Sequence, residues 1–316
     1  MEIRTVISFE GYFYCIFAAE MEEKKYKSGF VNIIGNPNVG KSTLMNKLVG
    51  ERLSIITSKA QTTRHRILGV VNDDNYQIVF SDTPGIIQPH YNLQTSMMKF
   101  VRSAFQDADV FLYMVEIGEK ALKDASFFER LKTTDIPILL LINKIDKSNQ
   151  VGVENAVAHW HEQLPKATII PISAIEGFGV DSIMNQITEL LPEGTPYFPT
   201  DALTDKPERF FVSEIIREKI LINYQKEVPY SVEVVVEAFK DEEAIIRIGA
   251  IINVARETQK GIIIGHQGKA LKKVGTEARK DLEVFFGKKV YLELFVKVMK
   301  NWRDNEQDLK RFGYFT

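Results

Sequence analysis

Short apolar segments alternate with amphipathic stretches from Gly29 to about Pro192. Six strands are predicted by the apolar runs GFVNIIG, RILGVVN, YQIVFSD, DVFLYMVE, PILLLINK and ATIIPIS, with helices between or after most of them. Several runs are apolar throughout, which is typical of strands covered on both faces. The segment VNDDNYQ predicts a hairpin turn and one antiparallel edge. The pattern therefore predicts a doubly wound α/β domain with a mostly parallel six-stranded sheet.

A different pattern follows Pro192. Residues 191–208 carry four of the eleven prolines, so a semi-rigid linker is expected there. Beyond it the pattern predicts an amphipathic helix, two paired strands, a helix, loop and helix, and a last strand. We therefore expect an α/β domain over residues 28–192, a linker over 193–207 and an α+β domain over 208–316.

Residues 1–27 are expected to form an extension outside both domains. Their apolar run GYFYCIFAA is shorter than the ~20 residues that span a bilayer. It faintly resembles the apolar part of a secretory signal, but Glu2 and Glu10 oppose the basic start of such signals. Our interpretation is an ill-ordered segment, with Met21 as the natural start of the working protein.

Composition and charge narrow the function classes. The chain has 316 residues, 45% hydrophobic and 26% charged, which is ordinary for a soluble globular protein. One cysteine excludes an internal disulfide framework, and the scattered histidines form no metal-ligand cluster in the sequence. The net charge of −2 hides an excess of basic residues between Lys260 and Lys300, where a polyanion is expected to bind.

The stretch GNPNVGKST follows a predicted strand and opens a predicted helix. Its two glycines let backbone N–H groups face an anion at the positive end of that helix. Lys41 is expected to reach the β- and γ-phosphates, and Ser42 to ligate Mg²⁺. The alternative is a glycine-containing turn that matches GxxxxGKS by chance. The predicted phosphate-binding residues are Gly35, Asn36, Pro37, Asn38, Val39, Gly40, Lys41, Ser42 and Thr43.

Three shorter motifs, DTPG, NKID and SAIEG, also follow predicted strands. Ligands bind at the carboxyl ends of strands in open α/β sheets. The Asp82 carboxylate can hold a Mg²⁺-bound water, and Gly85 can meet a γ-phosphate. The Asp146 carboxylate can accept two hydrogen bonds from guanine but none from adenine, so the motifs together predict a GTP/GDP site. The predicted residues are Asp82, Thr83, Pro84, Gly85, Asn143, Lys144, Asp146, Ser173, Ala174 and Ile175.

The polar segment KAQTTRHR precedes the second predicted strand. A threonine there can complete the Mg²⁺ shell and meet the γ-phosphate, as in loops that order with bound GTP. We choose Thr63, with Thr62 as the alternative and a plain polar loop as the other interpretation. The predicted metal ligands are Ser42, Thr63 and Asp82.

The second domain carries IIIGHQGKALKKVG. Two glycines around two polar residues, directly before a basic helix, match the GXXG loop with which KH domains clamp about four nucleotides of single-stranded RNA. A lone GxxG is usually an ordinary turn, but the apolar run before it and the lysines after it favour RNA. The predicted RNA-binding residues are Gly265, His266, Gln267, Gly268, Lys269, Lys272, Lys273, Arg279 and Lys297.

Together these motifs resemble the Era family of bacterial GTPases, in which a C-terminal KH domain follows the GTPase domain. The resemblance runs from about Gly29 to Tyr314. It implies a type II KH domain, cytoplasmic GTP hydrolysis, binding near the 3′ end of 16S ribosomal RNA, and assistance in assembling the 30S subunit. It also implies a monomer, with peripheral inner-membrane association neither supported nor excluded. His266 departs from the usual loop and is expected to weaken phosphate contact.

The residues that catalyse GTP hydrolysis are less evident from the sequence than those that bind the nucleotide. Many small GTPases follow the DxxG glycine with a glutamine that orients water, whereas Ile86 stands here. Related GTPases with this aliphatic residue use a potassium ion held partly by an asparagine, and Asn38 occupies the matching place; alternatively, Asn38 braces the loop. Arg64 and Arg66 are considered as arginine fingers. The candidate catalytic residues are Lys41, Asn38, Thr63 and Gly85.

The alternative function is a passive RNA chaperone whose GTP site is structural and turns over slowly. A related GTPase acting in tRNA modification or large-subunit assembly is disfavoured because the KH-like segment fits neither.

Overall fold

The computed structural model describes residues 25–314, so the expected amino-terminal extension lies largely outside the described residues. The first domain is built on a six-stranded sheet of order β2-β3-β1-β4-β5-β6. Only β2 is antiparallel to its neighbour, β3, which confirms the predicted sheet and its hairpin edge. The strands are β1 (Lys27–Gly35), β2 (Ile67–Asn72), β3 (Tyr76–Asp82), β4 (Val110–Glu116), β5 (Ile138–Asn143) and β6 (Thr168–Pro171).

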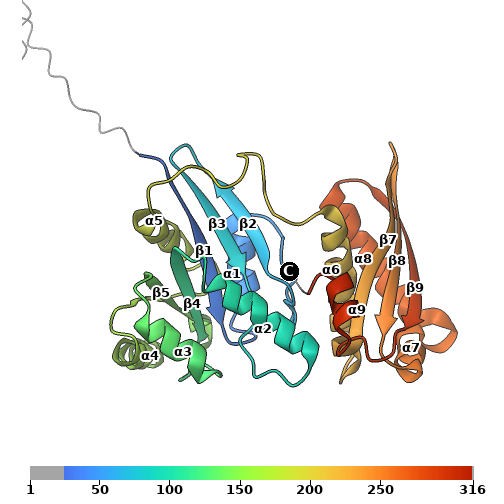
Figure 1. Ribbon diagram of the computed structural model, residues 1–316, viewed down its shortest axis with the longest axis horizontal. Coiled ribbons are helices and arrows are strands. Elements are labelled where there is room, and N and C mark those ends of the chain that lie inside the picture. The colour runs from blue at the N-terminus through green and yellow to red at the C-terminus, as the bar shows by residue number, and fades with distance from the viewer. Residues whose placement is uncertain (1–24, 315–316) are drawn as a thin grey trace, which may run out of the picture.

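Helices cover both faces of this sheet (Figure 1). They are α1 (Lys41–Val49), α2 (Asn92–Ala104), α3 (Ala125–Thr133), α4 (Gln150–Gln163) and α5 (Val180–Leu190). On one face, Val31 and Ile33 of β1 pack in a core with Leu44 of α1. On the other, Ile34 shares a core with Leu93 of α2. Because successive residues feed opposite cores, the strands are apolar throughout.

The proline-rich segment from 192 to 207 runs along the first domain before α6 begins. The Val70 N–H of β2 donates to the Leu203 carbonyl at 2.8 Å, and the Thr204 hydroxyl donates to the Leu68 carbonyl at 2.7 Å. An isolated bridge pairs Gly69 with Thr204. The expected linker is therefore attached to the edge of β2 rather than free of the sheet.

The second domain is a three-stranded sheet with helices, as predicted. Strand β8 pairs antiparallel with β7 and parallel with β9. A parallel pair needs a long crossover, and the helix, loop and helix supply it. The elements are α6 (Glu208–Asn223), β7 (Val232–Asp241), β8 (Ile245–Val254), α7 (Glu257–Ile264), α8 (Lys269–Phe286), β9 (Lys289–Val298) and α9 (Glu306–Arg311), with 3₁₀ turns η1 (Ile145–Lys147), η2 (Val228–Ser231) and η3 (His266–Gly268).

After β9 the chain returns to the first domain, so that α9 lies between the two sheets (Figure 1). Trp302, Leu309 and Tyr314 belong to the core that contains α2. The Leu93 N–H also donates to the Arg303 carbonyl at 2.9 Å. The two domains thus share buried side chains. No helix between residues 25 and 314 has the length and apolar character needed to cross a membrane.

Candidate nucleotide site and RNA-binding loop

The phosphate loop joins β1 to α1 in a backbone shape that requires glycine. Gly40 has φ 108°, and a Cβ there would lie 2.3 Å from Asn143 Nδ2. A Cβ on Gly35 would lie 2.2 Å from the Met114 carbonyl oxygen. Such contacts exclude any side chain. The tight loop therefore leads directly into the amino terminus of α1, and a helix amino terminus is a favourable place for an anion.

Lys41 is the buried cation of this loop. Its Nζ donates to the Asn36 carbonyl at 2.9 Å and to the Gly35 carbonyl at 3.3 Å. Burial lowers the pKa of Lys41 to about 8, although Asp82 and Glu119 oppose the shift. A buried ammonium that contacts only carbonyls is well placed to bind a phosphate, because an added anion would favour its charged form.

Three predicted metal ligands from distant segments lie together. The Ser42 hydroxyl donates to Asp82 Oδ2 at 2.7 Å. Thr63 Oγ1 lies 2.9 Å from Ser42 Oγ and 3.3 Å from Asp82 Oδ2. Asp82 is fully buried, and its Oδ1 has no hydrogen-bond partner among residues 25–314. Burial raises the pKa of the Asp82 carboxyl, against the effects of Lys41 and the hydroxyls. Hard oxygen ligands around an unpaired buried carboxylate oxygen fit Mg²⁺.

The NKID and SAIEG motifs meet the phosphate loop at the ends of β5 and β6. Asn143 Nδ2 donates to the Val39 carbonyl at 2.7 Å, and its Oδ1 accepts the Ala174 N–H at 2.9 Å. The exposed Asp146 accepts the Ser173 hydroxyl at 2.6 Å. Because Ala174 N–H is already engaged, it is not a free donor for guanine. Lys144 Nζ donates to the Asn38 carbonyl at 2.7 Å.

The DTPG segment crosses the phosphate loop closely. A Cβ on Gly85 would lie 2.6 Å from Pro37 Cα, so only glycine fits there. The Thr83 hydroxyl donates to the Ile33 carbonyl at 2.7 Å and holds the strand end. Ile86 is fully buried, and its N–H donates to the Gly35 carbonyl at 3.0 Å. Its side chain therefore has no access to a nucleophilic water.

A cavity of about 470 Å³ lies over these motifs. The predicted site residues that line it are Pro37, Asn38, Gly40, Lys41, Ser42, Thr43, Thr63, Gly85 and Lys144. Thr62, the alternative to Thr63, also lines it, but its hydroxyl is bonded to Thr57 Oγ1 and to the Lys59 carbonyl. The Thr63 hydroxyl is the one that reaches Ser42 and Asp82.

Neither arginine considered as a finger faces this cavity. Arg64 is fully buried and donates to the Val232 carbonyl at 2.7 Å and to Glu233 at 3.1 Å. Arg66 pairs with Asp107 at 2.6 Å. Both guanidinium groups are held elsewhere, so the structure contradicts a finger role for them in this conformation. Asn38 Nδ2 donates to the Ser58 carbonyl at 3.0 Å, which is the bracing contact of the alternative interpretation.

The GXXG loop lies between α7 and α8. Gly265 has φ 71° and Gly268 φ 73°, and Gln267 between them also has a positive φ of 52°. A Cβ on Gly268 would meet nothing within 4 Å. The open side of the loop can therefore be approached closely by a phosphate.

Exposed residues surround this loop at the amino terminus of α8. They are His266, Gln267, Lys269, Lys272 and Lys273. Arg279 lies ten residues further along α8, roughly 15 Å away, and pairs with Glu283 at 3.2 Å. Lys297 is exposed near the end of β9, opposite Asn253 of β8. The structure thus groups the lysines of the first turns with the loop, and Arg279 apart from it.

Comparisons with known proteins agree with this geometry. Residues 30–144 match the family described as 50S ribosome-binding GTPase, and residues 227–303 match the KH domain family. A crystal structure of Era in complex with MgGDPNP and nucleotides 1506–1542 of 16S ribosomal RNA is 41% identical, covering 92% of this chain and 99% of that one, with a TM-score of 0.87. The chain belongs to the Era family of GTPases.

A second Era-family structure gives the same result. A variant of Aquifex aeolicus Era bound to GDP and AlF₄⁻ is 41% identical over 91% of this chain and 99% of that one, with a TM-score of 0.87. The similarity therefore extends over both domains, and it confirms the resemblance based on the motifs.

Three charged residues of α6 beside the nucleotide-binding domain were not predicted from the sequence. Glu214, Arg217 and Glu218 are buried charges. Charged side chains in an amphipathic helix normally face solvent, so the pattern gave no signal that these three are enclosed. Only the polar segment after α1, which contains the partners of Arg217 and Glu218, stood out in the sequence.

Proposed function

We propose that this Era-family chain is a GTP-hydrolysing switch that binds 16S ribosomal RNA near its 3′ end and assists assembly of the 30S subunit. The observation that carries the proposal is the convergence of Ser42, Thr63 and Asp82 beside the buried Lys41. A pocket that only binds nucleotide does not require Thr63, which comes from the loop before β2. A threonine from that loop is expected in a site that responds to the γ-phosphate. The exposed GXXG loop in the same chain supplies the RNA-binding surface.

The residues divide the chemical work as follows. Lys41 and the N–H groups at the start of α1 bind the β- and γ-phosphates and offset charge that develops between them. Ser42, Thr63 and Asp82 hold Mg²⁺, which neutralises phosphate charge when bound. Gly85 lies against the phosphate loop, where its N–H can meet the γ-phosphate. Asp146 accepts the guanine N1–H and amino group, which selects guanine over adenine.

RNA recognition is proposed for the GXXG loop and the first turns of α8. The Gly268 backbone admits a phosphate, and Lys269, Lys272 and Lys273 add positive potential. A relative of this family was crystallised with nucleotides 1506–1542 of 16S ribosomal RNA, which supports that partner for this chain. We extend the proposal to a cytoplasmic monomer that acts on the 30S subunit. We also propose peripheral contact with the inner membrane, on the basis of the family resemblance.

The experiment measures GTP turnover by the full chain with and without an RNA oligonucleotide that ends in the 3′ sequence of 16S ribosomal RNA. Expected results are multiple turnovers and binding of the oligonucleotide. The matched variant Gly268→Asp places an anion and a side chain in the open loop, so it should weaken RNA binding and leave GTP binding intact. Equal RNA affinity in a filter-binding titration would contradict the KH assignment. Negligible turnover under both conditions would favour the passive chaperone instead.

A further inference from the structure

The loop that carries Thr63 is held from the second domain. We call residues 50–66, between α1 and β2, the switch loop. Arg52 of this loop pairs with Glu218 of α6 at 2.6 Å, and the Ile56 N–H donates to the same carboxylate at 3.1 Å. Lys59 Nζ donates to the Tyr224 carbonyl just after α6. The switch loop is therefore packed along α6.

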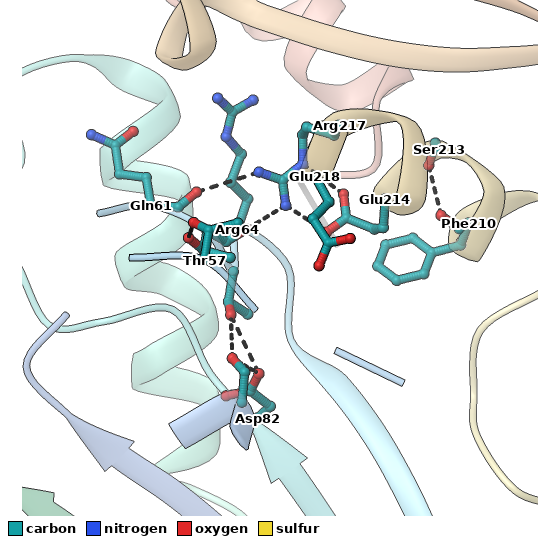
Figure 2. Close-up of polar contacts among 12 residues, drawn as sticks. Thr57, Gln61, Arg64, Asp82, Phe210, Ser213, Glu214, Arg217 and Glu218 are labelled. Carbon is teal, nitrogen blue, oxygen red and sulfur yellow. Dashed lines mark hydrogen bonds and ion pairs between the residues drawn. The ribbon is translucent and has the colours of Figure 1, made fainter. Parts of the chain in front are cut away.

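Another residue of α6, Arg217, contacts the switch loop directly beside Thr63. Its side chain is 1% exposed and that of Glu214, one turn earlier on α6, is 7% exposed. Arg217 Nε donates to Glu214 Oε1 at 2.7 Å, and Nη2 donates to Oε2 at 2.5 Å. This two-point pair fixes the plane of the guanidinium. The donors that remain reach the Gln61 carbonyl at 3.4 Å and the Thr62 carbonyl (Figure 2).

The contact with the Thr62 carbonyl sets the direction of the next amide. A trans peptide is planar, so the carbonyl oxygen of Thr62 and the N–H of Thr63 point in opposite directions. Figure 2 shows Arg217 on one side of the switch loop and Asp82 on the other. When Arg217 binds the Thr62 carbonyl, the Thr63 N–H is therefore directed away from α6. Thr63 lines the nucleotide cavity and its hydroxyl reaches Ser42 and Asp82.

Gln61, which precedes Thr62, has a strained backbone conformation. Gln61 has φ 57°, a left-handed conformation that a non-glycine residue keeps only when its surroundings hold it. Its side-chain Oε1 accepts the Tyr91 hydroxyl at 2.9 Å, and its carbonyl accepts Arg217. The left-handed turn at Gln61 is thus stabilised by one contact from each domain.

We propose that Arg217 is a positioning residue for GTP hydrolysis. It binds the carbonyls of Gln61 and Thr62 and thereby holds the Thr63 amide and hydroxyl toward the γ-phosphate and Mg²⁺. The inference rests on the proposed function, and it makes the second domain a supplier of geometry to the nucleotide site. Arg217 is not among the residues that line the nucleotide cavity, so its effect would reach nucleotide and metal through the switch loop.

The test compares the full chain with Arg217→Met. Because this change leaves the Glu214 carboxylate buried without a partner, the double variant Glu214→Gln with Arg217→Met is made as well. Both remove the donors to the switch loop, and the double variant removes the unpaired charge. Arg217→Lys keeps one charged donor and should recover part of the loss. The matched control is Arg52→Met, which breaks a contact of the switch loop with α6 but not one beside Thr63.

The readout is the ratio of affinities for a non-hydrolysable GTP analogue and for GDP, both with Mg²⁺, together with kcat and KM. Loss of a charge-assisted contact predicts a fall of at least about tenfold in analogue affinity and in kcat. GDP has no γ-phosphate, so its affinity should stay within about twofold of the parent.

Three outcomes would overturn the inference. Unchanged affinity for the GTP analogue in both variants that carry Arg217→Met would show that Arg217 does not position Thr63. An equal fall in Arg52→Met would assign the effect to docking of the domains in general. Equal losses for GDP and analogue would assign Arg217 a structural role only. A parent chain without GTP turnover would refute the proposed function, whereas the affinity ratio would still test Arg217.

Discussion

The phosphate loop and the switch loop both line the nucleotide cavity, but they are held in different ways. The side-chain contacts of the phosphate loop stay within the first domain: Asn36 Nδ2 donates to the Ala121 carbonyl at 3.1 Å, and Asn143 reaches the Val39 carbonyl. The switch loop has partners in the second domain at Glu218, Arg217 and Glu233. One side of the site is therefore preformed, whereas the other depends on how the domains are docked.

This difference indicates how the site can respond to its ligands. A preformed phosphate loop binds nucleotide whatever the second domain does. A switch loop that is bound to α6 can be completed or released by a shift of that domain, and by linkage a bound γ-phosphate biases the domain in return.

The largest effect is expected at the buried charge between the domains. Arg64→Met removes a fully buried guanidinium, so Glu233 loses its cationic partner, although the Tyr314 hydroxyl still donates to it at 2.7 Å, and two carbonyls of the η2 turn lose a donor. Breaking such a buried pair costs about 3–5 kcal/mol of stability. Urea unfolding can be followed by the fluorescence of Trp302, which lies at the domain contact, after Trp160→Phe removes the other tryptophan.

The matched control for this prediction is Arg247→Met. It breaks a pair with Glu242 in which both side chains are about half exposed, and such pairs contribute at most about 1 kcal/mol. If both variants lost the same small amount of stability, the Arg64 contact would not hold the domains together.

The phosphate loop should respond in activity rather than in docking. Lys41→Met removes the buried cation that we propose binds the phosphates, and losing one such group lowers turnover by about 100- to 1000-fold. RNA affinity and the Trp302 unfolding signal should stay at parent values, because Lys41 hydrogen-bonds only within its own loop. Lys47→Met, on the last turn of α1, is the control and should retain turnover. A large loss of RNA affinity in Lys41→Met would show that the phosphate loop also depends on the second domain.

The features within the first domain could be predicted from the sequence, whereas the contacts between the two domains could not. The strands, the hairpin edge and the meeting of Ser42 with Asp82 follow from local patterns and from the rule that parallel strands end at one edge. The partners of the switch loop were missed because Arg217 lies 156 residues from Gln61. Its charge is typical of a solvated helix face, and only docking buries it. Helix α9, Glu306–Arg311, is too short to show a helical period.

A smaller effect is expected from pH at the domain contact. His65 stacks on Tyr314 with ring centroids 4.3 Å apart. Burial lowers its pKa to about 3, and the nearby cations Arg217, Lys206 and Arg64 add to the shift. The unfolded chain, with a His pKa near 6.5, binds the proton first. Stability contributed by neutral His65 is therefore present above about pH 6.5 and is lost as pH falls toward 3.

The measurement is the free energy of unfolding at pH 7 and pH 5.5. A loss of about 1 kcal/mol is attributed to His65, since each pKa unit corresponds to about 1.4 kcal/mol and this interval covers one unit below 6.5. His65→Phe keeps an aromatic ring against Tyr314 and should remove that part of the pH dependence. His161→Phe, which replaces an exposed histidine on α4, should not. An identical pH dependence in His65→Phe would show that this imidazole does not titrate on unfolding.

The smallest effect is expected at Asn38, the residue that joins the two loops. Its exposed side chain donates Nδ2 to the Ser58 carbonyl of the switch loop, and its Oδ1 can face a cation beside the phosphates. If it holds potassium, replacing sodium by potassium should raise GTP turnover by no more than about fivefold, or about 1 kcal/mol in the barrier, because charges near water are strongly screened. Asn38→Ala should remove that gain with little change in GTP affinity. Thr57→Ala, which alters the switch loop nearby without touching Asn38, should retain the response to potassium. Equal rates in the two salts for the parent chain would instead leave Asn38 as a brace between the loops, and would point to a catalytic group supplied by the RNA or the ribosome in place of the water-orienting side chain that Ile86 lacks.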